Sequence, residues 1–236
     1  MSIFVFDMDG TLTPARLPMK SDFAEVFKSW QQNHLSFIAT GSDYKKVQEQ
    51  MPESVINGFT GVYCSMGNML IKQGQIEYEK SFDAPSGLLK DLENFRRNSS
   101  YPGQKYDNYI EKRVGMINYS VLGRNCPYEA RVEYAKWDKE FNERLDLQKQ
   151  LISRYPQLEI TVGGAISIDI TNQGCGKGQV ARHLRQMYPD DEIIFFGDKT
   201  FVGGNDYELA HELSLLSNTR TIQVSGPDEV LKILLK

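Results

Sequence analysis

The chain has 236 residues, which is long enough for one large domain or two small ones. Apolar residues make up 40% and charged residues 25%, the usual balance of a globular protein. The net charge of −4 argues against a nucleic-acid partner, which usually requires a basic face.

Targeting and redox signals are few. No stretch approaches the length of a membrane span, and the first apolar run ends at Asp7, so neither a signal peptide nor a membrane association is expected. Cys64, Cys126 and Cys175 are odd in number, far apart and without a CxxC pattern, which argues against a disulfide framework or a zinc site. The sequence therefore predicts a cytoplasmic protein.

The first part of the chain alternates predicted strands and helices. Residues 3–6 form a continuous apolar run, typical of a strand buried on both faces. Helix, strand, helix and strand follow at 22–32, 35–39, 43–51 and 61–64. This alternation indicates a parallel, doubly wound sheet, in which ligands bind beyond the carboxyl ends of the strands.

The middle of the chain has a different pattern. Two hairpins are predicted, turning at Gly74 and at Gly163-Gly164, and an alternating stretch covers 114–121. Residues 86–97 predict a helix, and the heavily charged stretch 127–155 is helical. This order is typical of an α+β domain.

The last part returns to the first pattern, with helices and strands predicted at 178–188, 193–196, 206–213, 221–224 and 228–235. The predicted fold class is therefore α/β, a doubly wound parallel-sheet (Rossmann-like) core with an inserted α+β cap domain. Residues 1–83 and 175–236 are assigned to the core, and residues 84–174 to the cap.

Two carboxylates, Asp7 and Asp9, directly follow the first strand. A carboxylate such as Asp7 can attack phosphorus, and Asp9 could transfer the proton of the leaving or entering oxygen. Gly10 allows a sharp turn, and Thr11 and Thr13 could bond the phosphate or the aspartates. Taken alone, this stretch is equally well explained as a solvated turn or a helix cap.

Polar residues also follow the other predicted strands. Thr40 and Gly41 offer a hydroxyl and a backbone N–H to a phosphate, and Lys177 offers a positive charge before a helix N-terminus. Gly178 follows Lys177 where a nucleotide-binding P-loop requires Ser or Thr, so that type of loop is excluded.

Carboxylates follow the strand at 193–196 as well. Asp198 could ligate magnesium, which attack on a dianionic phosphate requires, and Asn205 and Asp206 stand nearby in sequence. A single element of this kind is weak evidence, but four in order at the ends of predicted parallel strands indicate phosphoryl transfer.

This set of residues resembles the haloacid dehalogenase superfamily of phosphatases and phosphomutases. The resemblance implies Asp7 as nucleophile and Asp9 as acid and base. It also implies Mg²⁺ held by Asp7, the backbone carbonyl of Asp9, and Asp198. The position of the insertion after the third strand is similar to members that carry an α/β cap there.

Within that superfamily, residues 113–131, 163–170 and 195–206 and the stretch DGTLTPAR resemble the eukaryotic-type phosphomannomutases. The resemblance implies that the phosphosugar is bound by four arginines and two residues of a cap strand: Arg16, Arg113, Arg124, Arg131, Ser167 and Asp169. Several arginines can hold a phosphate through paired hydrogen bonds. Three arginines in nineteen residues could otherwise form a solvated surface.

The chain departs from this family at two places. Ser65-Met66-Gly67-Asn68 stands where the family has Glu-Asn-Gly, and residues 208–213 match poorly the helix end that supplies a further cation site. The preferred hexose and an accessory monovalent cation therefore stay open.

Three hypotheses follow. The first is a phosphomutase that interconverts mannose 6-phosphate and mannose 1-phosphate, with a hexose 1,6-bisphosphate as activator and a role in GDP-mannose supply. The alternative is a sugar-phosphate phosphatase with the same aspartates, and the third is a non-catalytic phosphosugar-binding protein. The resemblance also implies a homodimer formed through the cap.

Overall fold

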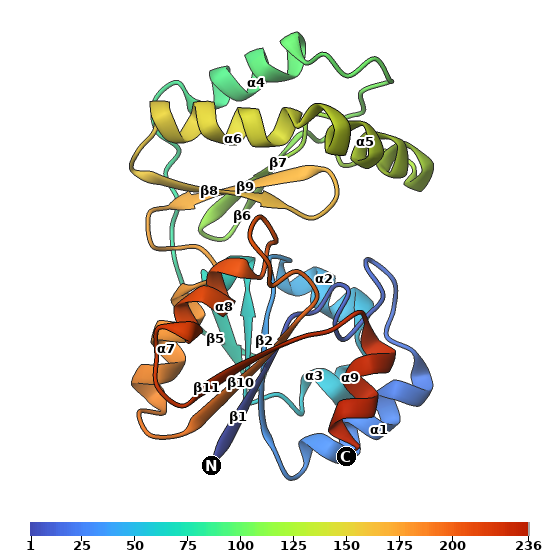
Figure 1. The fold of residues 1–236 in the computed structure, drawn as a ribbon, viewed down its shortest axis with the longest axis vertical. Coiled ribbons are helices and arrows are strands. Elements are labelled where there is room, and N and C mark those ends of the chain that lie inside the picture. The colour runs from blue at the N-terminus through green and yellow to red at the C-terminus, as the bar shows by residue number, and fades with distance from the viewer. Residues whose placement is uncertain (236) are drawn as a thin grey trace. The chain divides into compact units, whose positions relative to one another are not determined.

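The computed structural model describes residues 1–235 (Figure 1). The chain divides into two compact units. Unit 1 comprises Met1–Lys80 and the described chain from Cys175 onward, and unit 2 comprises Ser81–Gly174. The chain therefore leaves unit 1 once and returns to it once, so that segments far apart in sequence build unit 1 together.

Unit 1 contains a seven-stranded sheet in the order β11-β10-β1-β2-β3-β4-β5. The strands are β1 (Ser2–Phe6), β2 (Leu35–Ala39), β3 (Gly61–Cys64), β4 (Met69–Lys72), β5 (Gln75–Glu79), β10 (Glu192–Gly197) and β11 (Thr219–Gln223). The first five strands of that order are parallel, whereas β4 and β5 pair antiparallel at one edge. The hairpin predicted to turn at Gly74 thus extends the core sheet.

Helices cover both faces of this sheet, as Figure 1 shows. One buried apolar cluster includes residues of α1 (Ser21–Gln31), α2 (Tyr44–Gln50), α3 (Glu53–Ile56) and α9 (Pro227–Leu234). A second cluster includes residues of α7 (Gln179–Met187) and α8 (Tyr207–Ser214). This is a doubly wound arrangement, which confirms the predicted α/β core.

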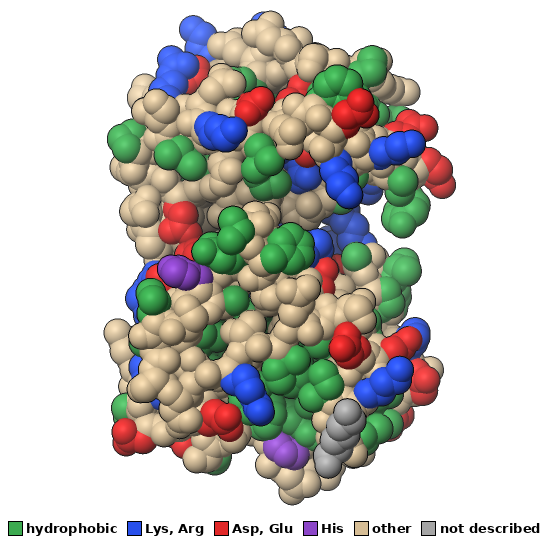
Figure 2. All heavy atoms as spheres, in the orientation of Figure 1, with side chains coloured by type: hydrophobic (Ala, Val, Ile, Leu, Met, Phe, Trp, Pro, Cys, Tyr) green, Lys and Arg blue, Asp and Glu red, His purple; other side chains and the backbone are tan. Residues whose placement is uncertain are grey.

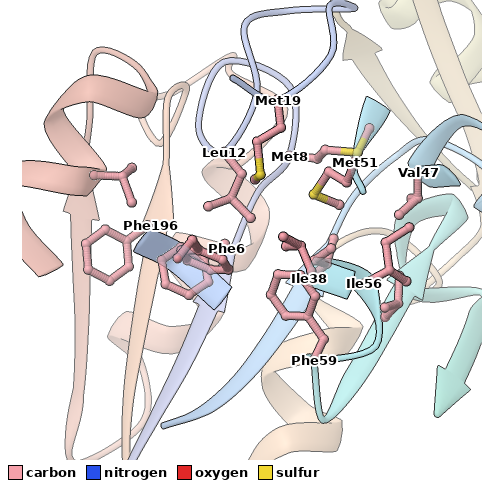
Figure 3. Packing of buried hydrophobic residues seen from close by; sticks show 14 of the residues in the cluster. Phe6, Met8, Leu12, Met19, Ile38, Val47, Met51, Ile56, Phe59 and Phe196 are labelled. Carbon is pink, nitrogen blue, oxygen red and sulfur yellow. The ribbon is translucent and has the colours of Figure 1, made fainter. Parts of the chain in front are cut away.

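The loop after β1 is anchored by apolar side chains (Figure 3). The rings of Phe6 and Phe196 are stacked with centroids 4.9 Å apart. Met8 and Leu12 are fully buried in the same cluster. Burial of each such side chain stabilises the fold by about 1.5–3 kcal/mol. The polar residues that alternate with them are therefore carried on a firmly packed loop.

Unit 2 has a four-stranded antiparallel sheet in the order β6-β7-β9-β8. Its elements are α4 (Leu88–Asn98), β6 (Ile110–Arg113), β7 (Met116–Tyr119), α5 (Tyr128–Phe141), α6 (Glu143–Arg154), β8 (Leu158–Gly163) and β9 (Ser167–Asn172). The predicted helical stretch 127–155 is thus two helices, which meet at Asn142 in the left-handed conformation (φ 57°).

Alternation along β7 and β9 divides the residues of this sheet between its two faces. Ile117 and Tyr119, with Ile168 and Ile170, belong to the apolar core of unit 2. The intervening residues are polar and buried, including Asn118 and Asp169. One face of the sheet is therefore apolar and the other carries buried polar side chains.

The surface carries both charges. On the face drawn in Figure 2, Lys and Arg side chains stand among Asp and Glu side chains. The three cysteines are free thiols. Within residues 1–235, none of the helices combines the length and the hydrophobicity that crossing a membrane requires.

Gly123→Ala tests a close backbone approach next to Arg124. Gly123 has φ +90°, and an added Cβ would lie 1.9 Å from the carbonyl oxygen of Tyr106. Gly164 also has a positive φ (+53°), but no atom of the described residues lies within 4 Å of its added Cβ. We expect Gly123→Ala to lower Tm far more than Gly164→Ala, which carries only the left-handed penalty of about 1–2 kcal/mol.

Thermal unfolding of both variants measures this difference, at roughly 2–4 °C for each kcal/mol in a chain of this size. Equal losses of Tm would show that the approach of Tyr106 does not require a glycine.

Candidate active site

The carboxyl ends of three adjacent strands carry the candidate residues of unit 1. Asp7, Thr40 and Asp198 directly follow β1, β2 and β10. In register, Phe6 of β1 pairs with Phe196 and with Ile38. Among the described residues, Asp7, Asp198 and Asp206 form a group whose carboxylate oxygens lie within 4.8 Å of one another.

Lys177 is fully buried and joins two of these carboxylates. Its Nζ donates to Asp7 Oδ1 at 2.6 Å and to Asp206 Oδ1 at 2.5 Å. A buried charge is tolerated only when it is paired and hydrogen-bonded, which these two contacts achieve. Asp206, which the sequence placed only near the site, is therefore a direct partner of Lys177.

The electrostatics of this cluster favour an added cation. Burial, with the charge of Asp206 as the next cause, raises the pKa of Asp7 to about 8, although the Lys177 ammonium opposes the rise. Burial also raises the pKa of Asp198, against the effect of Lys199. For Lys177, burial alone would lower the pKa, but Asp206 and Asp7 outweigh it and raise the pKa. The cluster thus has more carboxylates than its cations can neutralise.

The hydrogen bonds show which carboxylates fit a divalent cation. Asp7 Oδ2 and Asp198 Oδ1 are buried and, within residues 1–235, have no hydrogen-bond partner. Asp206 differs, because Oδ1 accepts from Lys177 and Oδ2 accepts from the backbone N–H of Lys199 at 3.2 Å. Oxygen ligands of this kind suit Mg²⁺. Asp7 and Asp198 therefore fit the metal, and Asp206 positions Lys177.

Gly10 and Asn205 lie close to the carboxylate cluster in space or in sequence. Gly10 has φ +90°, and a Cβ there would lie 2.5 Å from Asp198 Oδ2, so the loop after β1 approaches Asp198 closely because it carries a glycine. Asn205, in the loop before α8, has a buried Oδ1 with no hydrogen-bond partner in the described chain.

The carboxylate of Asp9 stabilises the loop after β1 through hydrogen bonds. Its Oδ1 accepts from the backbone N–H of Arg16 at 2.7 Å and from Gln50 Nε2 at 3.0 Å, and Ser42 Oγ donates to Oδ2 at 3.4 Å. Gln50 is buried at the end of α2. No motif marks Gln50 in the sequence, because its role depends on the packing of α2 against this loop.

The hydroxyls of the site have different partners. Thr13 Oγ1 donates to the Met8 carbonyl and accepts from Gln50 Nε2, so it stabilises the loop. Thr40 Oγ1, beside Gly41 at the end of β2, accepts from the backbone N–H of Ser42 at 3.1 Å. Thr11 Oγ1 is buried without a partner in the part of the chain described here. Its hydroxyl is thus suited to a phosphate oxygen.

Ser65-Met66-Gly67, where the sequence departs from the pattern of the family that it resembles, forms a turn. The backbone φ is positive at all three residues (49°, 64° and 87°). The backbone N–H groups of Ser65 and Met66 donate to the carbonyls of Ser42 and Thr40, both at 2.9 Å. This turn therefore braces the segment that carries Thr40 and Gly41, which the sequence alone did not indicate.

The polar face of the sheet in unit 2 brings together most of the predicted sugar-binding residues. Register aligns Glu111 of β6 with Asn118 of β7, and Asn118 with Asp169 of β9. Arg113 and Ser167 are each two residues from a member of this row, so alternation places them on the same face.

Arg124 is at the centre of these contacts. Its Nε pairs with Glu111 Oε2 at 2.6 Å, and its Nη1 donates to Asn118 Oδ1 at 2.6 Å and to Ser167 Oγ at 3.0 Å. Arg131, from α5, donates through Nη2 to the carbonyl of Arg124 at 2.6 Å. Glu111 and Asn118 were missed in the sequence, because their role depends on strand register.

Asp169 is buried and interacts electrostatically with Arg113 and Arg124. Asn118 Nδ2 donates to its Oδ1 at 2.6 Å, and a Cβ on Gly163 would lie 2.3 Å from its Oδ2. Burial raises the pKa of Asp169, although Arg113, Asn118 and Arg124 oppose the rise. Three arginines against Glu111 and Asp169 leave a net positive charge, which suits an anion.

Asp7→Asn tests how far the buried carboxylate cluster lowers the stability of the folded protein. The pKa of Asp7 is raised, so its contribution to stability is present below its usual pKa of 3.8 and is lost as pH rises through about 8. Asn is neutral throughout, and its amide oxygen can still accept a hydrogen bond from Lys177, which keeps its ion pair with Asp206. In metal-free protein at pH 8.5 we therefore expect Asp7→Asn to raise Tm by at least about 2–4 °C, and the gain to shrink at pH 6.

The measurement is thermal unfolding in EDTA at both pH values. Asp190→Asn, at an exposed aspartate of unit 1, is the control and should not change Tm. A lower Tm for Asp7→Asn at pH 8.5 would show that the bond to Lys177 outweighs the burial of the carboxylate.

The sequence of the chain is similar to those of known phosphomannomutases. The family model "Eukaryotic phosphomannomutase" matches residues 23–236. A phosphomannomutase from Dendrobium officinale is 35% identical over 234 residues, covering 96% of this chain and 90% of the relative. Phosphomannomutase 2 from Dictyostelium discoideum is 32% identical over 244 residues, covering 99% of this chain and 95% of the relative.

Solved structures show the same fold at low identity. A haloacid dehalogenase-like hydrolase from Bacteroides thetaiotaomicron has a TM-score of 0.63 at 14% identity, covering 99% of this chain and 98% of that one. A sugar phosphatase of subclass IIB of the same superfamily has a TM-score of 0.60 at 16% identity, covering 100% and 98%. These confirm the predicted fold class. By the family match and the identities to its relatives, the chain belongs to the eukaryotic phosphomannomutase family, and the predicted phosphomutase assignment is confirmed.

Proposed function

We propose that this protein is a Mg²⁺-dependent phosphomannomutase that interconverts mannose 6-phosphate and mannose 1-phosphate. The observation that carries the proposal is the state of the Asp7 carboxylate. One oxygen is held by the buried Lys177, and the other is buried without a hydrogen-bond partner in the described residues. An oriented carboxylate of this kind is suited to attack phosphorus.

The reaction proceeds through Asp7 and Asp9. The Asp7 carboxylate attacks a phosphorus of a hexose 1,6-bisphosphate, the bond from that phosphorus to the sugar oxygen breaks, and Asp9 protonates the departing oxygen. In the reverse direction, Asp9 takes the proton from a hydroxyl of the monophosphate. The oxygen of that hydroxyl then attacks the phosphorus of the aspartyl-phosphate, and the bond from phosphorus to Asp7 breaks. Transfer at opposite ends of the hexose converts one monophosphate into the other.

The metal site consists of Asp7, Asp198 and the backbone carbonyl of Asp9. When bound, Mg²⁺ neutralises the charge between the carboxylate and the phosphate. Lys177 keeps Asp7 oriented and adds a fixed positive charge next to it. Asp206 positions Lys177, and Asn205 lies beside it in the same loop.

Binding of the substrate is divided between two groups of residues. Thr11, Thr40, Gly41 and Lys177 hold the phosphoryl group that is transferred. Charged and polar groups elsewhere hold the sugar and its other phosphate: Arg16, Arg113, Arg124, Arg131, Ser167 and Asp169. Residues 1–83 and 175–236 are accordingly the catalytic core, and residues 84–174 the cap.

A sugar-phosphate phosphatase is the second candidate, because the same aspartates could pass the phosphoryl group to water. The arginine cluster of unit 2 favours the mutase, since a mutase must bind phosphate at both ends of its substrate. A cytoplasmic location, a role in GDP-mannose supply and a homodimer formed through the cap remain predictions of this proposal.

Product analysis separates the two candidates. With mannose 1-phosphate and a trace of glucose 1,6-bisphosphate we expect mannose 6-phosphate as the main product, and we expect Asp7→Asn to abolish its formation because the nucleophile is lost. Free phosphate without mannose 6-phosphate would contradict the mutase. A parallel assay on glucose 1-phosphate measures hexose preference.

Metal removal tests the cation site. EDTA should abolish product formation, and Mg²⁺ should restore it and raise Tm, because the metal binds the folded state and relieves the excess of carboxylates. Asp198→Asn should weaken both responses, whereas the exposed Asp190→Asn should leave both unchanged. Full activity after exhaustive metal removal would contradict a metal-dependent mechanism.

A further inference from the structure

Glu111 binds two arginines of the cluster in unit 2 at once. Its Oε1 accepts from Arg113 Nε and its Oε2 pairs with Arg124 Nε, both at 2.6 Å. The side chains of Arg113 and Arg124 are only 8% and 11% exposed. Two nearly buried guanidinium groups repel each other and lose hydration, so a shared carboxylate is needed to hold them together.

The sheet sets the position of this carboxylate. Glu111 is paired in register with Asn118, and Asn118 with Asp169, across three adjacent strands. Arg113 follows Glu111 by two residues on β6, and Arg124 reaches the row from the loop after β7. The carboxylate that holds both arginines is therefore positioned by backbone register, which is more rigid than a loop.

Asn118 completes the arrangement without adding charge. It accepts from Arg124 Nη1 and donates to Asp169 Oδ1, both at 2.6 Å, and is 3% exposed. Glu111 and Asp169 offset two guanidinium charges, and the neutral amide of Asn118 adds none. With Arg131 as the third arginine, a net positive charge remains to attract a phosphate.

We propose that Glu111 is a positioning residue for phosphosugar binding, which acts by fixing the orientation of Arg113 and Arg124. The proposal rests on the proposed function. Glu111 is unsuited to contact the phosphate itself, because two anions repel. Its effect is therefore exerted through the two arginines, and it should appear in the affinity for the phosphosugar more than in the chemical step.

Glu111→Gln is the direct test. The amide oxygen can accept from one Nε–H, but the NH₂ group faces the other Nε–H as a second donor, so one arginine loses its orientation. The matched control is Glu140→Gln, which removes the same charge from an exposed position on α5. Kinetics on mannose 1-phosphate with glucose 1,6-bisphosphate, together with Tm, are measured for the full chain.

We expect KM to rise about tenfold or more in Glu111→Gln, a loss of binding near 1.4 kcal/mol, with a smaller change in kcat. Tm should also fall, because the two nearly buried guanidinium groups lose their shared counter-charge, so kinetics and binding are measured at a temperature where the variant is folded. Glu140→Gln should change none of these. An unchanged KM, or a fall in kcat alone, would overturn the proposal.

Two further measurements keep the outcome clear. If Glu111→Gln does not fold, Glu111→Asp retains the charge but shortens its reach, and an unchanged KM there overturns the proposal. Calorimetric titration with glucose 1,6-bisphosphate separates positioning from reaction. Weaker binding by Glu111→Gln in a protein without mutase activity supports the positioning role and refutes the proposed reaction, whereas equal binding in an active mutase refutes the positioning role.

Discussion

The bond between the buried Lys177 ammonium and the carboxylates of Asp7 and Asp206 is the interaction on which unit 1 depends. It joins three parts of the chain, the loop after β1, the segment before α7 and the loop before α8. A fully buried ammonium is costly unless each contact is made, so these segments must arrive together. The same contacts leave one oxygen of Asp7 without a partner in the described chain, so this carboxylate keeps an oxygen available for the proposed metal and phosphoryl chemistry.

Unit 2 also contains buried charged side chains that need partners, but here the buried charges are positive. Its buried arginines are held by Glu111 and Asn118, which strand register places in one row with Asp169. In both units, one side chain bridges two groups of the opposite charge: Lys177 joins Asp7 and Asp206, and Glu111 joins Arg113 and Arg124. Fixed charges of this kind are oriented before a ligand arrives, so little reorganisation is needed on binding.

The packing of the core explains why these polar groups can stay in place. Met8 and Leu12 alternate with Asp7, Asp9 and Thr11, and their burial in the apolar cluster ties the loop to the sheet. In unit 2, Ile168 and Ile170 do the same for Ser167 and Asp169. Apolar and polar residues thus share each segment, and the apolar set stabilises the position of the polar set.

Local patterns in the sequence were enough to determine the alternation of strands and helices, the inserted α+β segment and the aspartates after β1, because periodicity and turn residues act over a few positions. Family resemblance added the arginines. The roles of Gln50, Glu111 and Asn118 were decided only by the tertiary structure, because each depends on a partner from another element and no spacing rule joins them. The different roles of Asp198 and Asp206 were also decided by the tertiary structure, although both are aspartates that follow β10. Lys177 lies where it binds Asp206, whereas an oxygen of Asp198 stays available to a metal.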